Sequence, residues 1–413
     1  MSKNKTVFLS DIHIGANAPT NWYQASVHEP YLNAALQYII DNKSAIRELV
    51  ILGDLVDFWT YLPDTRPPPF FNPDNPPDSI MRQNAAIFGD GVKGILGQLG
   101  WTVSALDGKV SFVRGNHDMT MTQDLLDHIP TGHASSIQLK PDTYFPLGHG
   151  NQDIVCTHGH EFSMLCAQDE ESRNDIKPLP LGYYVTRAGA YLAAKRLTPA
   201  KPNVADLPNT GEPTGLDITD EDYAKILYYL TFKSMGAAIT EVIQGETGLA
   251  WTAPILLPDG TATTLDDAFK NFDDLFDTWK HKRGLDGQLL GYTGALDALR
   301  YPDVDNDLLS YAQGLAAKYR AKIVVMGHTH VPQDGAQLVS AADASGNFIY
   351  ANSGFNCPSV PDMDGAARKR ATFVEIEESP SSYTVTMMEV VHSGGAYKVQ
   401  PDSDMKPVSI NKS

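Results

Sequence analysis

The sequence predicts an α/β (α+β) protein whose functional residues follow the ends of its strands. Five short apolar runs each end in Asp, Asn or His, the first runs are separated by segments with helical spacing, and near-alternating runs close the chain. Strands that alternate with helices indicate βαβ units and a parallel sheet. Open α/β sheets bind ligands at the carboxyl ends of such strands. We therefore expect the five polar motifs to meet at one edge of a sheet.

Each apolar run leads directly into a motif that offers hard metal ligands. In chain order, the runs are residues 6–9, 49–52, 110–113, 154–157 and 323–326, and the motifs are Asp11-Ile12-His13, Gly53-Asp54-Leu55-Val56-Asp57, Gly115-Asn116-His117-Asp118, His158-Gly159-His160 and Gly327-His328-Thr329-His330. Carboxylate, amide oxygen and imidazole suit hard or borderline divalent cations. The set exceeds the needs of one ion, whereas a pair of ions that shares a bridging carboxylate accounts for it.

The remaining elements follow from spacing and from turn residues. Apolar residues at helical spacing predict a helix over 29–47, with Pro30 in its first turn, and a second helix over about 78–99. Three short runs near the end predict antiparallel strands, at 348–350, 372–376 and 383–388.

The motif series divides the chain into a core and an insertion. Residues 1–166 and 318–395 carry the motifs and form the expected core, while 396–413 is expected to be a C-terminal tail. Residues 167–317 interrupt the series and are expected to form a large, mainly helical insertion or cap. An aromatic stripe over 265–279 is interpreted as packing within that insertion, with the wall of a substrate cleft as the alternative. A proline-rich stretch over 59–77 is either a surface loop or a rim of the site.

Composition narrows the class of protein. The chain has 413 residues, 42% of them hydrophobic and 20% charged, which is typical of a globular protein. A formal net charge of −18 makes nucleic acid an unlikely partner, because such a surface repels phosphate backbones. Three cysteines without Cys-x-x-Cys spacing argue against a disulfide framework and a thiolate metal site. No transmembrane run or cleavable leader is evident, so a cytoplasmic protein is expected, and the sequence carries no signal for oligomeric state.

The order of the five motifs resembles the calcineurin-like metallophosphoesterase superfamily. The resemblance covers about residues 5–165 and 318–390, and it implies a two-sheet β-sandwich flanked by helices. It also implies two metal ions (Mn, Fe or Zn). Asp54 would bridge them, and the other ligands would be Asp11, His13 and His330 for one ion and Asn116, His158 and His328 for the other.

The resemblance also implies roles beside the metal ions. His117 would act as proton donor or transition-state stabiliser, oriented by Asp118, and Asn116 and His117 would contact the substrate. Asp57 and His160 are interpreted as residues that fix the ligands. Arg187 in the insertion is a candidate to hold a substrate phosphate.

The expected activity is hydrolysis of a small phosphate ester, a diester or pyrophosphate of modest size, by metal-bound hydroxide with His117 as general acid. The alternatives are a phosphomonoesterase and a non-catalytic metal-binding scaffold. The segment 53–59 is reminiscent of UDP-2,3-diacylglucosamine hydrolases, but these typically carry Arg where His117 stands.

Overall fold

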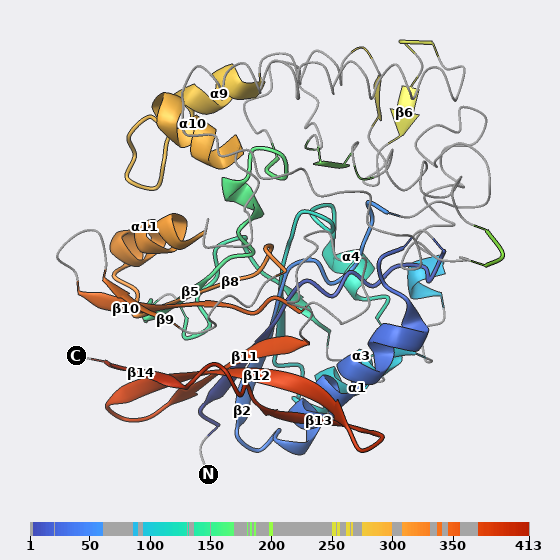
Figure 1. The fold of residues 1–413 in the computed structure, drawn as a ribbon, viewed down its shortest axis with the longest axis vertical. Helices are drawn as coiled ribbons and strands as arrows, with labels where there is room; N and C mark the ends of the chain where they lie inside the picture. The colour runs from blue at the N-terminus through green and yellow to red at the C-terminus, as the bar shows by residue number, and fades with distance from the viewer. Residues whose placement is uncertain are drawn as a thin grey trace.

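We analysed a computed structural model of the chain (Figure 1). The structure describes residues 3–19, 21–60, 86–89, 94–129, 131, 136–148, 150–168, 180, 182–183, 186, 198–200, 250–252, 254–256, 262–264, 266, 275–299, 308–330, 337–340, 346–355 and 371–412. Within these ranges, no helix is long and apolar enough to cross a membrane.

The larger sheet has eight strands and begins with parallel pairs, as the sequence predicts. It contains β1 (Lys5–Leu9), β2 (Ile46–Leu52), β3 (Val110–Val113), β4 (Gln138–Leu139), β11 (Thr372–Glu378), β12 (Ser382–Ser393), β13 (Ala396–Pro401) and β14 (Val408–Asn411). The order is β13-β12-β11-β1-β2-β3-β4, with β14 also paired to β12. The strands β1 to β4 are parallel, and β11 joins β1 in antiparallel register.

The smaller sheet has four strands in the order β5-β8-β10-β9. These strands are β5 (Ile154–Cys156), β8 (Ile323–Met326), β9 (Gln337–Ser340) and β10 (Asn347–Asn352). The expectation that all five motifs end strands of one sheet is therefore wrong. Three motifs follow β1, β2 and β3 of the larger sheet, and two follow β5 and β8 of the smaller one.

The two sheets pack face to face and are covered by helices on both outer sides. Side chains alternate along a strand, so Phe8 and Val50 pack in the cluster between the sheets, while their neighbours Val7 and Leu49 pack in the cluster that contains α1 and α3 residues. A third cluster joins the smaller sheet to α11. The strands that lead into the motifs are buried on both faces, which explains why their sequences are largely apolar. The predicted fold class, a two-sheet sandwich flanked by helices, is confirmed.

Helix positions differ in part from the expectation. The helices of the core are α1 (Ala25–Asp41), α3 (Ile95–Ala105), α4 (Gln123–Leu126) and α11 (Leu309–Tyr319). Helix α1 begins five residues before Pro30, which lies inside the helix and not in its first turn. Helix α3 lies later than the expected 78–99, and most of residues 61–93 falls outside the described part of the chain.

The C-terminal residues complete the larger sheet. We expected residues 396–413 to form a separate tail, but β13 and β14 pair side by side with the two halves of β12. The twelve-residue strand β12 would otherwise present a long open edge, and pairing satisfies its backbone groups.

Residues 167–317, which we expected to form an insertion, are described only in pieces. These are β6 (Pro254–Leu256) paired with β7 (Ala262–Thr264), and the helices α9 (Leu275–His281) and α10 (Gly291–Leu299). Figure 1 shows α9 and α10 on the same side of the molecule as α11. The expectation of a mainly helical insertion falls largely outside the described residues.

Candidate metal centre

The loops after β1, β2 and β8 hold their polar residues in a strained backbone conformation. Five candidate ligands have positive φ angles: Asp11 (57°), His13 (55°), Asp54 (52°), His328 (72°) and His330 (57°). Non-glycine residues adopt this conformation rarely, and such strain is concentrated at functional sites. The tight turns direct consecutive polar side chains into the space where the ends of the two sheets meet.

Glycines in the motifs allow these loops to approach closely. Gly53 has a φ of +81°, and a Cβ there would overlap the ring of His158. A Cβ on Gly115 would overlap the carboxylate of Asp54. The glycines are therefore required by the packing of loops from β2, β3 and β5 against one another.

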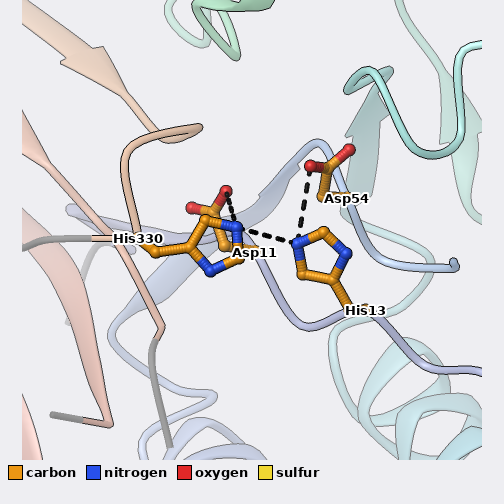
Figure 2. Close-up of side chains that lie close together, drawn as sticks. All are labelled: Asp11, His13, Asp54 and His330. Carbon is orange, nitrogen blue, oxygen red and sulfur yellow. Dashed lines mark hydrogen bonds and ion pairs between the residues drawn. The ribbon is translucent and has the colours of Figure 1, made fainter. Parts of the chain in front are cut away.

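The first cluster joins Asp11, His13, Asp54 and His330 (Figure 2). One ligand atom from each lies within 4.8 Å of the others. His13 Nε2 lies 3.0 Å from His330 Nε2 and 3.6 Å from Asp54 Oδ2. His330 Nε2 lies 3.9 Å from Asp11 Oδ1. Two carboxylates and two imidazoles thus converge on one small volume.

The second cluster joins Asp54 to His158 and His328, with Asn116 beside them. His158 Nε2 lies 3.3 Å from Asp54 Oδ2 and 3.2 Å from Asn116 Oδ1. His328 Nδ1 lies 3.0 Å from the same amide oxygen. The other ring nitrogen of His158, Nδ1, lies 2.7 Å from the carbonyl oxygen of Leu52. That contact fixes the ring and leaves Nε2 directed at the cluster.

Asp54 belongs to both clusters and is fully buried. Burial opposes ionisation of this carboxyl, but the neighbouring imidazoles, first of all His158, hold its pKa well below the usual range. Burial likewise opposes protonation of His158, but the charges of Asp54 and Asp11 raise the pKa of its ring to about 10. The buried carboxylates therefore concentrate negative charge at the centre, and this charge favours the binding of cations.

The donor set fits a pair of hard or borderline metal ions. It consists of carboxylates, an amide oxygen and imidazoles, without a thiolate. Two buried imidazole nitrogens of the clusters, His13 Nδ1 and His328 Nε2, have no hydrogen-bond partner among the described residues. An unpaired buried polar atom is costly unless another group satisfies it.

His117 is held by Asp57, and not by Asp118 as expected. His117 Nδ1 lies 3.0 Å from Asp57 Oδ1, and both residues are buried. The ring stacks on Trp59 at 4.2 Å between centroids and meets His13 edge-on at 4.5 Å. Burial lowers the pKa of His117, but the Asp57 carboxylate more than offsets this and raises it above the ordinary value. The partner of His117 therefore comes from the motif after β2.

Asp118 instead joins two loops through backbone hydrogen bonds. Its carboxylate accepts N–H groups from Gly115 at 2.7 Å, Leu55 at 2.7 Å and Val56 at 3.3 Å. Burial and the charge of Asp54 raise the pKa of Asp118 to about 7. Asp118 thus positions the loops that carry Asp54 and Asn116, because its oxygens face these backbone amides.

His160 lies beside the second cluster. Its ring is 5.5 Å from that of His158 and 6.5 Å from that of His328. It belongs to none of the clusters formed by described residues that could hold a metal. Burial, with the positive charges of His158 and Lys282, lowers the pKa of His160 to about 3. The His160 imidazole beside the second cluster is therefore neutral.

Two tryptophans at the site were not found from the sequence. The ring of Trp22 lies 5.1 Å from both His13 and His117 and 6.1 Å from His330. Trp59 stands two residues after Asp57, so its place at the end of a motif was a signal for it. Trp22 lies in no motif, and only the fold brings it to the centre.

Two residues outside the motifs complete the account of the site. The hydroxyl of Ser353, which follows β10, lies 2.6 Å from the hydroxyl of Ser10, the neighbour of Asp11. Arg187 falls outside the described residues.

Comparison with known proteins places the chain in a family. A sequence model described as "Calcineurin-like phosphoesterase" matches residues 5–230 of the 413. No curated protein matches the chain. Solved structures show only weak similarity. One is a conserved uncharacterized protein from Streptococcus pneumoniae described as a predicted phosphoesterase (11% identity, 97% of this chain and 99% of that chain covered, TM-score 0.28). Another is Vps29 of Chaetomium thermophilum in complex with a cyclic peptide (11% identity, 28% and 54% covered, TM-score 0.19). A Vps29 single mutant from Entamoeba histolytica also matches (15% identity, 25% and 52% covered, TM-score 0.15). On the sequence match, which covers more than half of its length, the chain belongs to the calcineurin-like phosphoesterase family.

Proposed function

We propose that this protein is a dinuclear-metal-dependent hydrolase of phosphate esters, acting on a phosphodiester or pyrophosphate of modest size. The observation that carries the proposal is the position of Asp54, whose carboxylate belongs to both clusters of candidate ligands. A carboxylate shared between two clusters is the arrangement that paired metal ions require.

Each cluster would hold one ion. Asp11, His13 and His330 would bind the first, Asn116, His158 and His328 the second, and Asp54 would bridge them. When bound, such ions supply an activated water and neutralise the charge of the phosphate oxygens. Which of Mn, Fe and Zn is bound is decided by availability as well as by ligands.

His117 would supply the proton that the leaving oxygen needs. Its Nδ1 faces Asp57, which leaves Nε2 as the ring nitrogen that can hold a proton toward the substrate. The Asp57 carboxylate favours the charged imidazolium, and Trp59 fixes the plane of the ring by stacking. A positioned imidazolium is suited to general-acid catalysis.

The surroundings of the centre favour a small ester over a polymer. Trp22 stands close to His13, His117 and His330 and would restrict the space around a bound phosphate. The net charge of −18 opposes the approach of long nucleic acids. The division into a core and a cap over 167–317, and a cytoplasmic location, stay predictions.

The test is a metal-dependence experiment on the full chain. The protein is stripped with a chelator, and Mn, Fe or Zn is added back before assay on a nitrophenyl monoester, a nitrophenyl diester and a nucleotide pyrophosphate. We expect activity to return with metal and to be higher on the diester or pyrophosphate. Higher activity on the monoester would assign a phosphomonoesterase, and two bound ions without hydrolysis of any ester would assign a scaffold.

A further inference from the structure

A cavity of about 450 Å³ opens beside the candidate metal centre, between the core and the insertion. Its lining includes the turn η2 (His160–Phe162), residues at the end of α9 and the loop after it, and two residues of α11. Binding sites for small organic ligands typically fall in the range of about 300–1,000 Å³. The cavity is thus large enough for a part of a substrate and not only for water.

The charge of the cavity lining is opposite to that of the protein. Four cationic residues line it: Arg114, Lys282, Arg283 and Lys318. Two carboxylates, those of Asp142 and Glu161, also line it. The whole chain has 50 acidic residues against 32 basic ones. A local excess of positive charge in so acidic a protein favours an anionic ligand.

The cavity also offers flat aromatic surfaces. Lys282 Nζ lies 4.1 Å from the centroid of the Trp279 ring. On the opposite elements, the rings of Phe162 and Tyr311 are stacked at 4.3 Å with an angle of 16° between them. Aromatic faces next to cationic groups suit a ligand that combines a planar ring with a negative charge.

The cavity lies next to the metal centre, because residues close to the candidate ligands in sequence and in space line it. His160 lines the cavity, and its ring lies 5.5 Å from that of the candidate ligand His158. Arg114 lines it as well and precedes Asn116 by two residues. His160 is 8% exposed, and its Nδ1 has no hydrogen-bond partner in the part of the chain that the structure describes. The cavity therefore adjoins the second cluster at His160, which lines the cavity and packs beside the ring of His158.

We infer that the cavity between η2, α9 and α11 binds the part of the substrate beyond the reacting phosphate, and that this part is a ring-bearing anion such as a nucleoside monophosphate unit. The inference rests on the proposed hydrolysis for its link to turnover, but not for binding itself. Lys282 and Arg283 hold the anionic group, and Trp279, Phe162 and Tyr311 surround the ring.

Binding is tested on the full chain after metal removal, so that the metal centre does not hold the probe. Isothermal titration calorimetry measures thymidine 5′-monophosphate, with thymidine as the ring alone and inorganic phosphate as the charge alone. We expect the monophosphate to bind more tightly than either part. Combined Lys282→Ala and Arg283→Ala substitutions should weaken it about tenfold or more, as loss of charge-assisted hydrogen bonds does. Lys280→Ala is the matched control, because this lysine lies on α9 but does not line the cavity.

A second measurement uses the metal-loaded protein and two substrates with the same leaving group. These are the p-nitrophenyl ester of thymidine 5′-diphosphate, in which a thymidine monophosphate unit lies beyond the phosphate that carries the nitrophenyl group, and methyl p-nitrophenyl phosphate. The double variant should raise KM for the thymidine ester about tenfold and leave the methyl ester unchanged. Equal binding of thymidine 5′-monophosphate by the parent and the double variant would overturn the inference. Binding that depends on Lys282 and Arg283, without hydrolysis of either ester, would support the cavity and contradict the proposed hydrolysis.

Discussion

Asp57 Oδ1 lies 3.0 Å from His117 Nδ1, so a carboxylate after β2 holds the histidine that follows β3. Burial disfavours the charge on Asp57, but His117 lowers the pKa of this carboxyl to about 2. The two residues form a buried pair of opposite charge beside the metal clusters. Replacing either residue of this pair should therefore affect catalysis.

Replacing His117 should affect the reaction and not the binding of metal. We expect His117→Ala to retain both ions while kcat falls about 100-fold or more, within the range of general-acid catalysis. The loss should be smaller for nitrophenolate, which leaves without a proton, than for a poor leaving group. Metal analysis and kcat on a matched pair of esters check this. An equal loss on both esters would exclude general-acid catalysis by His117.

Asp57→Asn should lower kcat in the same direction but by less, because the amide keeps a polar contact with His117 while the charge is lost. The same dependence on leaving group should appear in this variant.

As a comparison, Asp118→Asn should act through the loops, because Asp118 accepts hydrogen bonds from backbone groups of Gly115, Leu55 and Val56. We therefore expect Asp118→Asn to lower the melting temperature. Asp57→Asn should instead change how kcat depends on the leaving group. The reverse pattern would restore Asp118 as the partner of His117.

Asp54→Ala should remove more metal than loss of any ligand to one ion, because Asp54 is shared by both clusters. We expect elemental analysis to find less than one ion per chain in Asp54→Ala and about one in His330→Ala, which removes a ligand from the first cluster only. Turnover should be lost almost completely in the first variant. Two ions bound to Asp54→Ala, as in the parent protein, would refute the bridging role.

Gly115→Ala should disturb the packing of the metal centre although it adds only one methyl group. A Cβ at this position overlaps the Asp54 carboxylate and backbone, so the loops after β2 and β3 must separate. Overpacking of this kind typically costs about 1–3 kcal/mol of unfolding free energy. Gly150→Ala serves as the control, because a Cβ there meets no atom of the described residues within 4 Å. We expect Gly115→Ala to lower both the metal content and the free energy of unfolding, measured with denaturant. Unchanged values would show that the loops can accommodate the added methyl group.

Glu378 should make the C-terminal strand sensitive to acid. Its carboxylate lies 2.6 Å from Lys412 Nζ, just after β14, and 2.6 Å from an Arg47 guanidinium nitrogen on β2. Burial raises the pKa of Glu378, but these two cations more than offset this, and the net shift is downward. A carboxyl whose pKa is lowered by folding stabilises the protein above its unfolded pKa, about 4.3, and loses this contribution as pH falls through the folded value.

Glu378→Gln should therefore reduce the free energy of unfolding at pH 7 by no more than about 1 kcal/mol, and the difference from the parent should shrink below about pH 4. Glu389→Gln is the control, because Glu389 accepts its hydrogen bond from the neutral amide of Gln400. Urea unfolding at several pH values measures both variants. A constant difference for Glu378→Gln across the pH range would mean that the charges contribute nothing.

The sequence by itself determined the strands and the polar motifs at their ends. Runs such as Ile323–Met326 are apolar throughout because both faces of these strands are buried, and this pattern identifies a strand without knowledge of its neighbours. The ligand types are also local, since Asp11 and His328 follow strands directly and glycines mark the turns. The distribution of the candidate ligands into two groups came from resemblance to a family, and the structure brings the same residues together.

Only the tertiary structure decided how the motifs are shared between sheets and which side chains meet. Two sheets and not one supply the strands, because pairing depends on contacts between segments far apart in the chain. The neighbour of His117 in sequence, Asp118, points to backbone amides, while Asp57 reaches its ring from another loop. Trp22 carries no motif and reaches the centre only through folding. Local spacing fixes which face of a strand or turn a side chain occupies, whereas its partner is set by loop packing that no single segment encodes.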